Sequence, residues 1–205
     1  MKSSTGAFGK FRNTFIGDRK FYSTVILLIL PLIVQNAISN FVSLLDNIMI
    51  GRVGTVEMSG VAIVNQLMFV FYLAIFGGLS GAGIFGAQYF GAKDNEGLRY
   101  TVRFKLWTIA ATLAVAVAIF IAYGDGLISL FLKGEGSPAD RAAMLEHAKN
   151  YLRVMLWGLP PFALSQVYSG TLRETGETML PMKASLAAVF TNLVLNYIMI
   201  FGKFG

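Results

Sequence analysis

The stretch FYSTVILLILPLIVQNAISNFVSLLDNIMIG (Phe21–Gly51) decides the class of this protein, because Asp46 is the one charged residue in it. A helix rises about 1.5 Å per residue, so about 20 apolar residues cross the ~30 Å hydrocarbon core of a bilayer. The whole chain has the same character: 55% of its 205 residues are hydrophobic, 14% are charged, and the mean hydropathy is +0.62. Soluble domains carry about 25% charged residues. We therefore expect an all-α integral membrane protein.

Four further apolar stretches predict four more membrane helices. The second stretch is a run of 35 uncharged residues between Glu57 and Lys93, which we interpret as one long, bent helix because glycines crowd its second half. The last three stretches each hold 19 uncharged residues. A basic tail, residues 1–20, precedes the helices, and residues 21–205 form one helical unit. The five predicted transmembrane helices cover approximately residues 21–50, 57–90, 102–124, 144–172 and 182–202.

The distribution of Lys and Arg predicts the orientation, because cytoplasmic loops of membrane proteins carry an excess of these residues. Alternate loops carry 11 Lys and Arg on one side of the membrane and 6 on the other. The richer side comprises the tail and residues 93–105 and 173–183; the poorer side comprises residues 51–57, 125–153 and the C-terminal end. We therefore expect a multi-pass plasma-membrane protein with a cytoplasmic N-terminus and an extracytoplasmic residue 205. The tail also lacks the apolar core of a secretory signal.

Composition excludes several classes of function. The chain has no cysteine and a single histidine, so its sequence offers neither a disulfide framework nor a thiolate metal site. It has no phosphate-binding glycine loop, no metal-spaced His and Cys set and no Ser/His/Asp arrangement. Its basic residues fall in short clusters between apolar runs, which topology explains better than a nucleic-acid-binding face. We therefore expect that the protein is not an enzyme, binds no nucleic acid and has no cofactor besides a coupling ion.

The first predicted helix has one polar side. On a helical wheel, Gln35 and Ser39 lie within roughly 20° of Asp46. An ionisable group in a bilayer costs several kcal/mol and by default marks a functional site. Asp46 also has a second interpretation, as an acid at the outer interface, because 25 uncharged residues precede it. The sector of the helix next to Asp46 holds Asn36, Asn40, Ser43 and Asn47.

Other predicted helices contribute amides. Asn192 and Asn196 are one turn apart in the fifth helix, and Asn65 and Gln66 lie in the second. A single Asn or Ser in a membrane helix often only forms a hydrogen bond to a neighbouring helix, which stabilises the pair by ~0.6 kcal/mol on average. Seven polar positions on one side of one helix favour a cavity instead. The candidate cavity-lining residues are Gln35, Ser39, Asn40, Ser43, Asn65 and Gln66.

Four segments together resemble one family of membrane transporters. These are LLDNIMIGRVGTVEMSGVAI (Leu44–Ile63), GAQYFGAKDNEGLRY (Gly86–Tyr100), YLRVMLWGLPPFALSQVYSGTLRETGETMLPM (Tyr151–Met182) and NLVLNYIMIFG (Asn192–Gly202). In this order they resemble the multidrug and toxic compound extrusion (MATE) transporters. The resemblance covers almost everything after residue 20.

The resemblance implies a drug or metabolite antiporter, driven by Na⁺ or H⁺, with two lobes of about six helices facing each other across a central cavity. In that family an acid at the position matching Asp46 takes part in cation coupling. Polar residues matching Asn192 and Asn196 complete the site in some members. Some members carry an acid where this chain has Asn196, so the resemblance leaves the coupling ion open and implies no metal besides Na⁺ at Asp46.

The resemblance reaches only the N-terminal part of such a transporter, about five of twelve helices. Alternating access needs two repeats that move against each other around a shared site. We therefore expect a partial N-terminal lobe, an N-terminal fragment inactive until a C-terminal lobe completes it. The complete transporter would export drugs or other amphipathic organic compounds across the plasma membrane.

Two alternatives remain at this point. One is a half-transporter that a partner chain completes. The other is a lipid-linked saccharide flippase of the same superfamily, which would need a more basic central cavity than these uncharged spans provide.

Overall fold

The computed structural model describes residues 17–52, 54–133 and 136–200, and helices account for almost all of them. The helices are α2 (Arg19–Gly51), α3 (Thr55–Gly91), α4 (Asn95–Phe131), α5 (Pro138–Glu174) and α6 (Met179–Ile200). No residue within the described ranges lies in a β-strand. The predicted all-α fold class with five helices is confirmed.

Four of the described helices, α2, α3, α4 and α6, are long and apolar enough to cross a membrane. Helix α5 is as long as α3 and α4, at 37 residues, but its first half carries charges and its second half contains Pro160 and Pro161. It packs against both α3 and α4, and its buried residues, from Met144 to Val167, lie along one face. The chain is a multi-pass membrane protein in which the least apolar helix lies against its neighbours.

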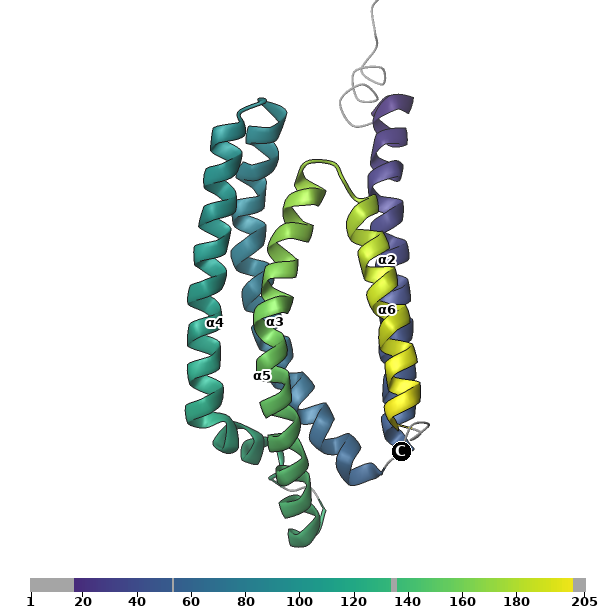
Figure 1. Ribbon diagram of the computed structural model, residues 1–205, viewed down its shortest axis with the longest axis vertical. Coiled ribbons are helices and arrows are strands. Elements are labelled where there is room, and N and C mark those ends of the chain that lie inside the picture. Colours follow the sequence, from purple (N-terminus) through teal and green to yellow (C-terminus); the bar gives the residue numbers. More distant parts are fainter. Residues whose placement is uncertain (1–16, 53, 134–135, 201–205) are drawn as a thin grey trace, which may run out of the picture.

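Helix α3 is a single helix of 37 residues, as expected from the uncharged run, and not two crossings joined by a turn. Figure 1 shows that its first part, which begins near the end of α2, is inclined to the remainder. Gly60 lies in this first part, and a Cβ atom there would approach backbone atoms of Met144 and Ala148 to 3.1 Å. The glycine therefore permits the close approach of α3 to α5.

The helix ends follow from local sequence. Asp94 caps α4 by accepting hydrogen bonds from the backbone N–H groups of Glu96 and Gly97, at 3.1 and 2.9 Å. Ser137 and Asp140 form a capping box at the start of α5. Hydrogen bonds from the hydroxyl and the backbone of Ser137 hold the pKa of Asp140 below its usual range. Gly176 follows α5 with φ +83°, a left-handed conformation that suits glycine and turns the chain into α6.

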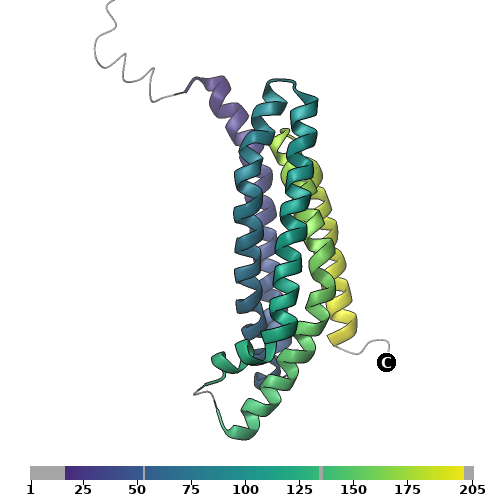
Figure 2. The same cartoon turned by 90° about the vertical axis from the view of Figure 1, so that its left-hand side faces the viewer.

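The helices form two groups. Helices α3, α4 and α5 pack on one another, and α2 and α6 pack side by side and run in the same direction (Figures 1 and 2). The two groups meet less extensively, through α2 with α3 and α5 with α6. The core of the first group includes the fully buried side chains of Val64, Met68, Ile128, Leu159 and Val167.

The outer surface is apolar. Trp157 is 87% exposed and Trp107 is 78% exposed, and many Phe, Leu and Ile side chains also face outwards. Large apolar side chains on the outside of a helix bundle suit hydrocarbon and not water. The distribution of side chains therefore agrees with the membrane class that hydropathy predicted.

Candidate functional site

The polar contacts between α2 and α6 join three residues that the sequence singled out. Asn196 on α6 donates a hydrogen bond from Nδ2 to Oδ1 of Asp46 on α2, at 2.8 Å. The same Nδ2 atom lies 3.2 Å from Oδ1 of Asn192, one turn earlier on α6. The structure thus brings Asp46, Asn192 and Asn196 into one cluster. We call these three residues the Asp46 cluster.

A second polar contact joins the same two helices. Gln35 donates from Nε2 to the hydroxyl oxygen of Ser185 at 2.5 Å. Gln35 and Asp46 are eleven residues apart on α2, and Ser185 and Asn196 are eleven residues apart on α6. Eleven residues make about three turns of helix, so each pair lies on one face. Because α2 and α6 run in the same direction, both contacts occur in register along one seam.

The Asp46 cluster has the chemistry of a site for a small cation. Asp46 and Asn196 are partly buried, and only Oδ1 of the carboxylate accepts a hydrogen bond from the residues described. A proton or a metal cation would bind at the other carboxylate oxygen, for which no hydrogen bond from the described residues is seen. Oxygen atoms of carboxylates and amides are the ligands that hard cations prefer, and Asn192 has an amide oxygen 3.2 Å from the Nδ2 atom that also contacts Asp46.

The six candidate cavity-lining residues are not gathered in one place. Gln35 and Ser39 are half-buried, whereas Asn40, Ser43, Asn65 and Gln66 are exposed on their helices. Ser43 donates its hydroxyl to the backbone carbonyl of Ser39, at 3.0 Å. Of the six, Gln35 contacts another helix through its side chain, by its bond to Ser185.

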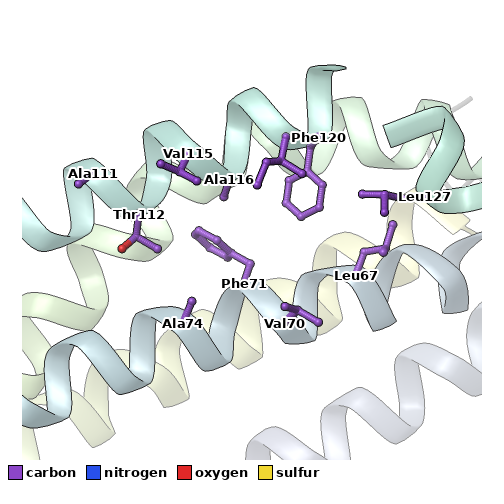
Figure 3. A pocket seen from close by; sticks show the side chains of 11 residues that line it. Leu67, Val70, Phe71, Ala74, Ala111, Thr112, Val115, Ala116, Phe120 and Leu127 are labelled. Carbon is purple, nitrogen blue, oxygen red and sulfur yellow. The ribbon is translucent and has the colours of Figure 1, made fainter. Parts of the chain in front are cut away.

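A cavity between α3 and α4 offers no carboxylate or amide ligands for an ion among the residues described. It has a volume of about 570 Å³ and apolar walls, with Thr112 contributing a hydroxyl. Figure 3 shows the rings of Phe71 and Phe120 projecting into it from the two helices. The Thr112 hydroxyl already donates to the backbone carbonyl of Thr108, at 2.9 Å. An apolar surface of this kind suits lipid or another helix and not a cation.

A second polar site, which was not predicted from the sequence, is buried between α4 and α5. Lys105 is 1% exposed and forms an ion pair with Glu174, and its ammonium group also lies 3.4 Å from the hydroxyl of Thr171. A Cβ atom on Gly83 or on Gly86 would lie 2.5 Å from a carboxylate oxygen of Glu174. Two glycines of α3 therefore make the space that the carboxylate occupies.

This ion pair corrects the treatment of Lys105 as a charge of the 93–105 loop. Helix α4 begins at Asn95, so Lys105 lies three turns inside it. Lys105 immediately precedes the uncharged run of α4, and Glu174 lies two residues beyond that of α5. Opposite charges at the ends of two neighbouring antiparallel helices were the available signal. The buried lysine is neutralised by its partner, so it does not supply the basic cavity expected of a flippase.

The sequence model of the MatE family matches residues 31–198, a range that includes the whole Asp46 cluster. The chain is 32% identical over 181 residues to the probable multidrug resistance protein NorM of Thermotoga maritima; the match covers 88% of this chain and 38% of that protein. It is 29% identical over 178 residues to the probable multidrug resistance protein NorM of Bacillus subtilis, and this match covers 87% of this chain and 38% of that protein.

A third relative is more distant. The multidrug resistance protein MdtK of Edwardsiella ictaluri is 25% identical over 182 residues, with 89% of this chain and 38% of that protein covered. The chain therefore spans 38% of the length of these three relatives. No solved structure gives a significant match.

Proposed function

This chain belongs to the MatE family, and from that premise we propose that it is the N-terminal part of a cation-coupled antiporter that exports drugs or other amphipathic organic compounds. The names of its relatives, multidrug resistance proteins, support the substrate class. The excess of Lys and Arg on one side supports an N-terminus in the cytoplasm and a residue 205 outside the plasma membrane.

The observation that carries this proposal is the hydrogen bond between Asn196 and Asp46. It places an ionisable carboxylate between two helices that meet along one seam, in a segment where charge is costly. A cation that binds Asp46 alters the interaction between α2 and α6. Cation and substrate then drive exchange because each favours a different conformation of the transporter.

The two candidate ions make different demands on Asn196. A proton can occupy the free carboxylate oxygen of Asp46 and leave the bond to Asn196 in place. A sodium ion takes oxygen ligands, so Asn196 contributes a ligand to it only after its amide turns, with the NH₂ group away from Asp46 and Oδ1 towards the ion. If the coupling ion is H⁺, Asn196→Asp adds a second acid beside Asp46 and shifts the pH range in which efflux is active to higher pH. If the coupling ion is Na⁺, the same change strengthens Na⁺ binding.

Transport also needs a second lobe, which we propose comes either from further residues of the same protein or from a partner chain. Alternating access requires two units around one site. The exposed polar side chains of Asn40, Asn65 and Gln66 support this proposal, because polar groups in hydrocarbon cost free energy until protein or water satisfies them.

Drug efflux by a complete transporter that contains this chain tests the proposal. We expect Asp46→Asn to abolish cation-driven efflux of a fluorescent drug while expression and membrane insertion stay near normal. Asp125→Asn is the matched control, because it removes the same charge from an exposed carboxylate that pairs with Lys149. Full efflux by the Asp46 variant would make Asp46 an interfacial acid without a role in coupling.

A further inference from the structure

A second candidate binding site is separate from the Asp46 cluster. It is a cavity of about 320 Å³ between α3 and α5, which falls within the size range of small-molecule sites. Asp46 lies five residues before the end of α2, whereas this cavity reaches Glu174 at the end of α5. Figure 1 shows that α5 ends at the side of the bundle where α2 begins. The cavity therefore reaches the end of the bundle opposite to Asp46.

The cavity has an apolar part and a cationic part. Tyr72, Phe76 and Phe162 contribute aromatic walls, and the rings of Tyr72 and Phe162 lie 4.7 Å apart between centroids. Gln166 and Arg173 contribute polar groups on the α5 side. An elongated molecule with one apolar and one polar end matches this distribution.

Arg173 lacks a partner for part of its guanidinium group. Its Nε atom is buried and makes no hydrogen bond to any residue in the described part of the chain. Buried donors in proteins are nearly always paired. Burial lowers the pKa of the Arg173 guanidinium, yet an arginine keeps its charge at neutral pH. An acceptor with negative charge would satisfy both the orphaned donor and the charge.

The acid next to Arg173 is committed to another cation. Glu174 pairs with Lys105, and the space for its carboxylate is provided by Gly83 and Gly86. Lys105 is buried, so this pair holds Glu174 towards α4 and neutralises it. Among the described residues, Glu174 is the acid that lines the cavity, and its ion pair is with Lys105 and not with Arg173.

We propose that this cavity binds an amphipathic anion, with its carboxylate or phosphate at Arg173 and its apolar part along Phe76 and Phe162. Arginine donors arranged as a planar fork suit carboxylate and phosphate groups. The anion comes from the headgroup region of a lipid or from a free amphiphile such as a fatty acid. This site acts independently of cation coupling at Asp46, so its test does not depend on transport.

Binding of a fluorescent fatty acid to the 205-residue chain tests this inference. The chain is placed in nanodiscs of phosphatidylcholine, 11-(dansylamino)undecanoate is titrated, and fluorescence is compared with empty nanodiscs. We expect saturable binding that Arg173→Gln weakens about tenfold or more, because a charge-assisted hydrogen bond is lost. The methyl ester of the probe, which lacks the charge, should show no saturable binding.

Two further variants make the result specific. Arg103→Gln is the matched control, because Arg103 lies near the same end of the bundle on α4 and stacks on Tyr100 at 5.7 Å, outside the cavity. The affinity of this variant for the probe should stay within about twofold of that of the unaltered chain. Lys105→Met releases Glu174, which can then pair with Arg173, so it should also weaken binding. Circular dichroism melts of each variant monitor folding.

The binding measurements can overturn the inference and can identify the source of the anion. Equal affinity for the Arg173 variant and the unaltered chain, equal loss in the Arg103 variant, or equal binding of the methyl ester would overturn the inference. An affinity for inorganic phosphate equal to that for the probe would also overturn it, because the apolar part of the probe would then contribute nothing to binding. Competition by phosphatidylglycerol in the nanodiscs supports a lipid as the source of the anion, and its absence supports a free amphiphile.

Discussion

Replacing Lys105 by Met should destabilise the protein far more than the same replacement at Lys149. Both lysines pair with an acid, Lys105 with Glu174 and Lys149 with Asp125. The first pair is buried, with side chains 1% and 17% exposed, whereas the second is 32% and 67% exposed. Breaking a buried pair costs about 3–5 kcal/mol because a charge stays behind without its partner.

The structure narrows this range for Lys105→Met. Glu174 reaches the edge of the cavity beside Arg173, so water or Arg173 partly satisfies it after the change. We therefore expect a loss near the lower limit, about 3 kcal/mol, which is a more than hundredfold change in the unfolding equilibrium. Lys149→Met should cost less than about 1 kcal/mol, as exposed pairs do.

Equilibrium unfolding in mixed micelles, followed by the fluorescence of Trp107 and Trp157, measures both variants. The double variant Lys105→Met with Glu174→Leu removes both charges and should recover most of the lost stability, because an apolar pair often replaces a buried ion pair without cost. Equal losses for Lys105→Met and Lys149→Met, or no recovery in the double variant, would refute the reasoning about the buried charge.

Three more experiments test the packing of the helices and the proposed topology. Gly83→Ala should destabilise the bundle in a thermal melt, because the new Cβ atom would lie 2.5 Å from Glu174. Gly81→Ala should raise stability by up to about 1 kcal/mol through helix propensity, because no atom lies within 4 Å of its Cβ position. A double-mutant cycle of Gln35→Ala and Ser185→Ala should give a coupling free energy of about 0.6 kcal/mol; zero coupling would contradict the contact between α2 and α6. A cysteine at position 133 should react with an impermeant thiol reagent outside intact cells, and one at position 95 should not; the reverse labelling would invert the proposed topology.

Hydropathy was sufficient to predict the five helices, because each contains an uncharged run long enough to cross a bilayer. Helices α4 and α5 extend beyond those runs at their charged ends, where caps such as Asp94 and Ser137 fix the first turns. The predicted helix of residues 102–124 already contained Lys105, but charge counting could not foresee that α4 starts at Asn95 or that Lys105 is buried.

Helical periodicity placed Gln35 and Asp46 on one face, but the choice of partner came from tertiary structure. The three-turn spacing on α2 is repeated between Ser185 and Asn196 on α6, and only the parallel packing of α2 and α6 shows that the two spacings coincide. Asn65 and Gln66 show the limit of this reasoning. They are polar residues in a membrane helix, yet the face they occupy is exposed in the described bundle.

Infrared difference spectroscopy of the purified chain tests the central claim, that Asp46 binds the coupling cation, most directly. The carboxyl spectrum is recorded in nanodiscs before and after addition of Na⁺, and separately across a pH titration. We predict a carboxyl band that responds to one of these changes, is absent in Asp46→Asn and persists in Asp125→Asn. A response of the same size in the Asp46 variant would contradict the assignment of the cation to Asp46.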